Sequence, residues 1–180
     1  MTPNARFHEL IKDITPSATT NSRSSSAHTK LREALLKDKD YKDDIINTFL
    51  GGSYKRSTAI RPVTKDGDTE RPDVDMYVVV KGSTWSTSQV DLIEDLYDAL
   101  NRNRTALNIT KLKRNRCSIS VSTNKADMDV SPLLDRQSDG YFRIGNRIKA
   151  EWYKTDPVEH NEWSARENKK RGDALTPWLN

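Results

Sequence analysis

Residues Phe49 to Val80 read FLGGSYKRSTAIRPVTKDGDTERPDVDMYVVV and decide the fold. One apolar run ends at a Gly-Gly-Ser turn, and the next opens with the pair Asp73 and Asp75. We expect strands over 45–50 and 73–80, with a short helix from Ser53 and a polar loop over 63–72 between them. Such a turn suits a phosphate and such a pair suits a divalent metal. Together they indicate an enzyme that moves a nucleotidyl group.

The turn is suited to an anion by its backbone. Gly51 and Gly52 allow backbone angles that other residues avoid, so a strand–turn–helix unit can aim amide N–H groups at a phosphate. Ser53 adds a hydroxyl, and Lys55 and Arg56 add positive charge. Gly-Gly-Ser is also a common ordinary turn, and in that alternative the two cations are simply solvated.

The acidic pair is suited to a hard cation. Asp73 and Asp75 lie two residues apart in an expected strand, so their side chains share one face, with Cα atoms roughly 6.5 Å apart. Surface acids at a strand start are the alternative, but the core-like run Met76–Val80 follows at once. A third carboxylate would come from Asp127 or Asp129 in a neighbouring strand, and spacing alone does not choose between them.

The flanking sequence completes an α+β pattern. Apolar residues at helical spacing predict helices over 7–14 and 90–100, and Asp156-Pro157 begins a helix that runs towards Arg171 and stops at Gly172. Strands over 117–122 and 126–133 form one expected hairpin, and segments 141–144 and 147–153 form another. We therefore predict a mixed sheet with helices packed on it.

The segment Thr15–Thr29 has two interpretations. Nine of its fifteen residues are Ser or Thr, which is typical of a flexible linker. Alternatively it begins a helix that continues through Leu36, and Thr15 as a cap with Pro16 near the start favours the helix.

Composition excludes several classes of protein. The 180 residues include 34% hydrophobic ones, which is enough for a modest core, and no apolar stretch approaches the roughly 20 residues of a membrane span. The single cysteine, Cys117, excludes an internal disulfide framework. The N-terminus lacks the pattern of a signal peptide, so we expect no membrane association and a cytoplasmic location.

Charge is segregated along the chain, although the net charge is only +4. Residues 101–116 hold six basic residues and no acid, whereas residues 66–75 hold five acids. This places cations near a polyanionic substrate and acids around a metal, or else it marks two solvated loops.

The wider text narrows the class. GGSYKRSTAIRP, DVDMYVVV, MDVSPLL and WYKTDPVEHNEWSARENK resemble the bacterial cGAS/DncV-like nucleotidyltransferases of the polymerase-β-like superfamily, over roughly residues 15 to 178. The resemblance implies a polymerase-β-like core. It also implies metal-dependent joining of NTPs into cyclic or linear oligonucleotide second messengers for anti-phage defence, with release of pyrophosphate.

The resemblance also assigns roles. Asp73, Asp75 and Asp129 would be catalytic and would bind Mg²⁺ (or Mn²⁺), with Asp127 in reserve. The residues that would contact the nucleotide are Gly52, Ser53, Lys55, Arg56 and Arg61.

Three regions follow from the same resemblance. Residues 1–40 would be N-terminal helices on the core, 41–172 the catalytic core, and 173–180 the start of a truncated helical lobe. The surface left by that lobe would favour self-association. The run Arg102–Arg116 would bind a nucleic-acid activator or, the favoured alternative, remain solvated. A downstream effector would read the nucleotide product.

Two other functions remain open at this point. A nucleotidyltransferase that modifies RNA ends or protein hydroxyls would fit this length. A catalytically impaired fragment that only binds nucleotide is the second alternative, against which the acid triplet argues.

Overall fold

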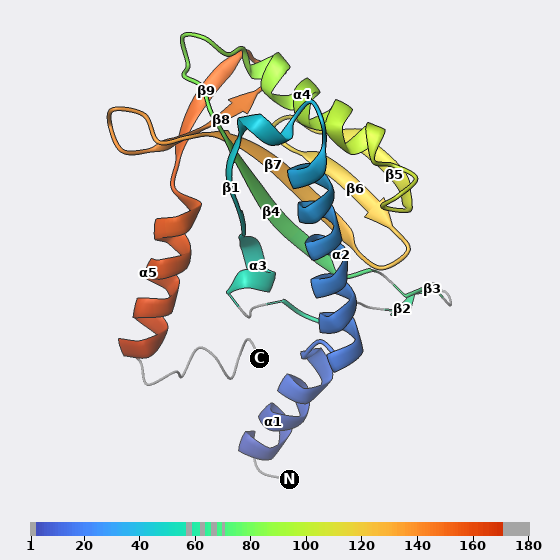
Figure 1. Ribbon diagram of the computed structural model, residues 1–180. Helices are drawn as coiled ribbons and strands as arrows, with labels where there is room; N and C mark the ends of the chain where they lie inside the picture. Colours follow the sequence, from blue (N-terminus) through green and yellow to red (C-terminus); the bar gives the residue numbers. More distant parts are fainter. Residues whose placement is uncertain (1–2, 57–58, 62–63, 66–67, 70, 171–180) are drawn as a thin grey trace.

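The computed structural model describes residues 3–56, 59–61, 64–65, 68–69 and 71–170, and it confirms the expected α+β architecture (Figure 1). The helices are α1 (Pro3–Ile14), α2 (Ala18–Lys37), the 3₁₀ turn η1 (Lys42–Asp44), α3 (Gly52–Lys55), α4 (Gln89–Arg102) and α5 (Pro157–Lys170). The strands are β1 (Ile45–Leu50), β2 (Thr64–Lys65), β3 (Asp68–Thr69), β4 (Asp73–Val80), β5 (Ile109–Arg114), β6 (Ile119–Thr123), β7 (Asp127–Leu134), β8 (Phe142–Asn146) and β9 (Glu151–Thr155).

The main sheet is mixed, with the order β1-β4-β7-β6-β5. Its central pair, β4 and β7, is parallel, whereas β1, β6 and β5 join antiparallel. The predicted β6–β7 and β8–β9 hairpins both form, and β8 pairs with the far end of β7. The parallel pair brings two segments more than fifty residues apart in sequence into register.

Helices α2 and α4 cover one face of this sheet (Figure 1). Alternate residues of β4 and β7 turn towards them, because side chains of a strand alternate between faces. Leu31, Leu35, Ile93, Leu96 and Leu100 from the two helices are at most 1% exposed. Burial of each such side chain contributes about 1.5–3 kcal/mol, so this face anchors the central strands.

The opposite face has apolar cover at one end. Val79, Leu133 and Phe142 form a second cluster there, and Val158 at the start of α5 packs against it. At the other end the same face carries the aspartates of β4 and β7. The sheet is therefore rigidly backed where its acidic residues project.

The Ser/Thr-rich segment is helical, as the favoured interpretation predicted. Ser24, Ala27, Leu31 and Leu35 form the buried stripe of α2. The Ser24 hydroxyl donates to the Thr20 carbonyl at 3.1 Å, which satisfies it inside the helix. This stripe is what overrides the linker-like composition.

The predicted cap of α2 was wrong by two residues. Ser17, not Thr15, is the N-cap, and its hydroxyl accepts from the Thr20 amide at 3.1 Å. Thr15 Oγ1 instead donates to the Ile11 carbonyl at 2.6 Å, at the end of α1.

Strand β5 lies inside the basic run 101–116 and was not predicted from the sequence. Its pattern, ITKLKR, places lysines and arginine on an edge strand, where charged side chains are common and conceal the apolar alternation. The short pair β2–β3 lies within the expected polar loop.

The C-terminal helix begins as predicted. Asp156 Oδ1 accepts from the Glu159 amide at 3.0 Å. The expected stop at Gly172 and the region 173–180 lie outside the described residues. Within the described part of the chain, none of the helices has the length and apolar content of a membrane span.

Candidate active site

Four aspartates project from one face at the start of the two parallel strands. Asp73 lies opposite Asp127, and Asp75 lies opposite Asp129. Alternate residues of a strand share a face, and partners in adjacent parallel strands point the same way. The parallel pairing therefore supplies the neighbouring strand that the acidic pair required.

Electrostatic repulsion marks this cluster. Burial raises the pKa of Asp73, and the carboxylates of Asp75, Asp129 and Asp127 raise it further. Burial and Asp129 likewise raise the pKa of Asp75, while Arg56 opposes them. Carboxylates crowded in this way favour an added cation.

The donor set fits a hard divalent cation, although the carboxylates are not drawn together into a finished site. No three Asp, Glu, His or Cys side chains within the described ranges already stand at metal-ligand spacing. Mg²⁺ commonly takes only one or two protein carboxylates and completes its shell with water and substrate phosphates. The pKa values of Asp73 and Asp75, raised by burial and by the neighbouring carboxylates, are the observation that supports the fit.

The contacts separate Asp127 from Asp129. Asp127 accepts from Arg71 Nε at 3.1 and 3.2 Å, so a guanidinium already balances its charge. Asp129 accepts at 2.7 Å from the hydroxyl of Ser120, which is neutral. Asp129 is therefore the better candidate for the third ligand.

The Gly-Gly-Ser turn is built against the acids. The Gly51 amide donates to the Asp75 carbonyl at 3.0 Å, and Asn161 of α5 donates to the Leu50 carbonyl at 3.3 Å. Gly52 has φ +60°, and a Cβ on it would stand 1.6 Å from Asp75 Oδ2. Only glycine therefore allows this turn to approach the carboxylate.

The short helix expected from Ser53 forms as α3. With four residues it has a single turn, so its dipole adds little at the turn. Anion binding at this turn would therefore depend on its backbone amide groups rather than on the helix dipole.

The predicted basic contacts are placed unequally. Arg56 lies close enough to oppose the raised pKa of Asp75, and Lys55 is exposed to solvent. Arg61 instead donates through Nε to the Thr15 carbonyl at 3.0 Å and through Nη2 to the Lys12 carbonyl at 3.1 Å. Its guanidinium is used to close the end of α1.

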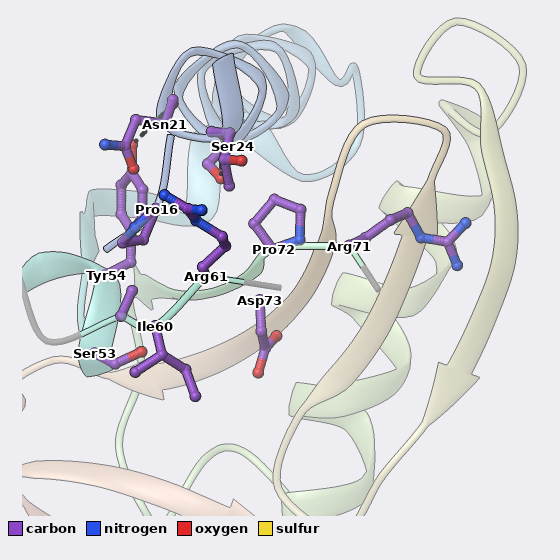
Figure 2. Close-up of a pocket in the computed structure, with 12 residues that line it drawn as sticks. Pro16, Asn21, Ser24, Ser53, Tyr54, Ile60, Arg61, Arg71, Pro72 and Asp73 are labelled. Atoms are coloured by element: carbon purple, nitrogen blue, oxygen red, sulfur yellow. Dashed lines mark hydrogen bonds between the residues drawn. The ribbon is translucent and has the colours of Figure 1, made fainter. Parts of the chain in front are cut away.

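A cavity of about 170 Å³ lies beside the acids, between the start of α2, α3 and Pro72 (Figure 2). Ser53, Arg61 and Asp73 line it together with the apolar walls of Pro16, Tyr54 and Ile60. Ligand pockets usually span about 300–1,000 Å³, so this cavity holds at most part of a nucleotide.

Half of the basic run is committed to the fold. Arg102 pairs with Asp38 at 2.6 Å, and Arg114 pairs with Glu94 at 2.7 Å while lying 3.2 Å from the Tyr97 ring centroid. Arg104 donates to the Ile109 carbonyl at 3.3 Å. These contacts weaken the expectation of a nucleic-acid site there.

Three residues beside the acids were not predicted from the sequence. Arg71 pairs with Asp127, Ser120 donates to Asp129, and Asn115 donates through Nδ2 to Ser120 Oγ at 2.7 Å. The signal for Ser120 was visible, because serines alternate with Ile119 and Val121 and therefore share a face. Arg71 stands two residues before Asp73, and no sequence pattern there indicated that it would pair with a carboxylate of the site.

Comparisons with known proteins bear on the family and the fold of this chain. Residues 1–168 match the model of the Second Messenger Oligonucleotide or Dinucleotide Synthetase domain. A cyclic AMP-AMP-AMP synthase from Acinetobacter sp. is 38% identical over 179 residues, which cover 98% of this chain and 50% of the relative. The chain thus spans about half the length of that relative.

Solved structures share the fold at low sequence identity. The Bradyrhizobium diazoefficiens CD-NTase CdnG in complex with GTP superposes with a TM-score of 0.75 at 16% identity, over 92% of this chain and 48% of that one. Escherichia coli DncV bound to 3′-deoxy GTP gives 0.69 at 13% identity, over 93% and 61%. The predicted α+β fold, a mixed sheet with helices packed on it, is therefore confirmed as the fold of these CD-NTase structures.

Proposed function

Because this chain belongs to the Second Messenger Oligonucleotide or Dinucleotide Synthetase family, we propose that it carries the catalytic core of an enzyme that joins NTPs into cyclic or linear oligonucleotide messengers. One observation carries the proposal. Three carboxylates, Asp73, Asp75 and Asp129, share an open sheet face, and the Gly52 turn lies against one of them. We further propose that the product acts through a downstream effector in anti-phage defence.

Asp73, Asp75 and Asp129 would hold the divalent metal, Mg²⁺ or Mn²⁺. When bound, such an ion neutralises charge on the transferring phosphate and on the departing pyrophosphate. Burial and then the neighbouring carboxylates raise the pKa of Asp73 and Asp75, and a cation that joins these carboxylates relieves the repulsion between them. Relief of this repulsion is a physical reason to expect that the activity depends on a metal ion.

The turn would hold the phosphates of the donor NTP. Backbone amides at Gly52 and the Ser53 hydroxyl present donors beside the acids, and Arg56 supplies positive charge there. Lys55 is exposed at the same turn and adds charge from outside. Arg61 contributes from the neighbouring cavity only if it leaves the carbonyls of Lys12 and Thr15.

The reaction needs no side-chain nucleophile. A ribose hydroxyl of one NTP gives up its proton to solvent and attacks the α-phosphorus of the next. A P–O bond forms, and the bond from that phosphorus to the bridging oxygen breaks, so that pyrophosphate leaves. Positioning and charge stabilisation supply the acceleration. The rigidly backed strands β4 and β7 suit that demand, because they fix the carboxylates on packed elements rather than on loops.

ATP is the first substrate to test, since the Acinetobacter relative is named for a cyclic triadenylate. The protein in its full natural length is incubated with Mg²⁺ and all four NTPs, without RNA or protein acceptor, and products are separated by chromatography and mass spectrometry. Small oligonucleotides support the proposal. Labelling of added tRNA or protein in their absence would replace it with an end-modifying activity.

A double variant tests the residues. Asp73→Ala with Asp75→Ala is expected to abolish turnover while the circular dichroism spectrum stays unchanged. Asp98→Ala, on the exposed side of α4, is the control and should retain the wild-type rate. Turnover in the double variant refutes the metal role.

A further inference from the structure

A chain of hydrogen bonds reaches Asp129 from the neighbouring strand. Ser120 stands directly opposite Asp129 in the antiparallel β6–β7 pair, and its hydroxyl lies 2.7 Å from Asp129 Oδ1. Asn115 Nδ2 lies 2.7 Å from Ser120 Oγ and 3.4 Å from Asp129 Oδ1. From this geometry we infer that Ser120 and Asn115 are positioning residues for the third metal-binding carboxylate.

The direction of each hydrogen bond is determined by chemistry. The amide nitrogen of Asn115 only donates and the ionised carboxylate only accepts, so Ser120 accepts from Asn115 and donates to Asp129. A hydroxyl polarised from behind donates more strongly. Oδ1 is thus held by the protein, and Oδ2 is left for the metal.

Asn115, at the end of this chain of hydrogen bonds, is held in place by its own backbone hydrogen bonds. The Asn115 amide donates to the Ser118 carbonyl at 2.8 Å, and its carbonyl accepts from Arg147 Nε at 2.8 Å. Its side chain also reaches Ser118 Oγ at 3.2 Å. Because both backbone bonds survive a side-chain substitution, the network can be cut at Asn115 without releasing the turn.

The neighbouring pair provides a matched comparison. Ser122 stands opposite Asp127 on the same face of β6, two residues from Ser120. Asp127 takes its hydrogen bonds from Arg71 instead. Strand β6 therefore places two serines opposite two aspartates, and Ser120 donates a hydrogen bond to the carboxylate of Asp129.

This inference rests on the proposed function, since it assigns Asp129 to the metal. Hydrogen-bond partners behind metal ligands typically change metal affinity by 10–100-fold when removed. We expect Ser120→Ala to weaken metal binding by about tenfold, and Asn115→Ala to act in the same direction but less. Ser120→Thr keeps the hydroxyl and should restore affinity, whereas Ser122→Ala should bind as the wild type does.

The test measures Mn²⁺ binding directly. Mn²⁺ is added in steps to the full-length protein in the presence of an ATP analogue whose α,β-bridging oxygen is replaced by methylene. The concentration of free Mn²⁺ is measured at each step by electron paramagnetic resonance. The Mg²⁺ concentration for half-maximal turnover is measured in parallel. The expected result is a loss of affinity in Ser120→Ala that Ser120→Thr reverses.

The outcomes separate the inference from the proposed function. A wild-type protein that binds no Mn²⁺ overturns both. Wild-type binding with unchanged affinity in Ser120→Ala, or an equal loss in Ser122→Ala, overturns only the inference. If the circular dichroism spectrum shows that Ser120→Ala is unfolded, the Mn²⁺ affinity of Asn115→Ala is used instead, because that variant keeps Ser120 in the strand. Wild-type affinity in Asn115→Ala would then overturn the inference.

Discussion

Substitution of Gly52 by alanine tests whether the turn and the acidic pair form one site. The residue has φ +60°, where an L side chain costs about 1–2 kcal/mol. The added Cβ would stand 1.6 Å from Asp75 Oδ2 and 2.5 Å from its Cγ. Ordinary contact requires roughly 3.5 Å between such atoms, so the carboxylate must move by more than about 1 Å.

That displacement of the Asp75 carboxylate should lower the catalytic rate. A misplacement of about 1 Å can reduce the rate about 100-fold, so we expect a loss of at least that size in Gly52→Ala. The backbone cost adds a fall of about 1–2 kcal/mol in the free energy of unfolding.

Gly140→Ala is the matched control. Gly140 has φ +80° in the β7–β8 turn, and a Cβ there meets nothing within 4 Å. It carries the same kind of backbone cost without a collision. Its expected result is a similar loss of stability with the wild-type rate of oligonucleotide synthesis.

Both variants are compared by urea unfolding and by the initial rate of product formation in the full-length protein. A Gly52→Ala enzyme with the wild-type rate would refute the packing of the turn on Asp75. Equal loss of activity in Gly140→Ala would show that backbone strain, not the collision, is responsible.

Three further outcomes are expected. Asp129→Asn should reduce turnover at least about 100-fold, since a lost metal ligand removes several kcal/mol of charge stabilisation, whereas Asp127→Asn should stay within about tenfold; equal losses would contradict the assignment. Chelation by EDTA should stop synthesis and added Mg²⁺ should restore it, and activity that survives chelation would exclude metal dependence. Burial raises the pKa of Asp38, but hydrogen bonds from Arg102 and backbone and side-chain neighbours hold it below its usual value. A lowered pKa stabilises the fold above about pH 4, so wild-type stability should fall as pH drops below that range, and Asp38→Asn should show a shallower fall in acid unfolding curves.

Local sequence predicted most elements because their signals are local. The strand over 73–80 could be placed from its acidic start and apolar run, and α4 from its 3.6-residue periodicity. Strand β5 was missed because an edge strand buries little, and its lysines hide the alternation. The cap of α2 was misplaced because Thr15 and Ser17 are chemically equivalent until the end of α1 is known.

The choice between two acids shows the limit of spacing. By spacing alone, Asp127 and Asp129 are equally good candidates for the third metal-binding carboxylate, since both are flanked by apolar residues and share a face. Their partners differ only in three dimensions, where Arg71 reaches Asp127 and Ser120 reaches Asp129. Those partners lie 56 and 9 residues away along the chain.

The sequence by itself determined the chemical class of this protein, because a glycine-rich turn and an acidic pair at the start of the next strand both lie within residues 51–75. Tertiary structure alone decided which carboxylates meet. The parallel pairing of β4 with β7 aligns Asp75 with Asp129, and the positive φ of Gly52 lets the turn touch Asp75. Registers between distant strands depend on the packing of the whole core, which no local pattern records.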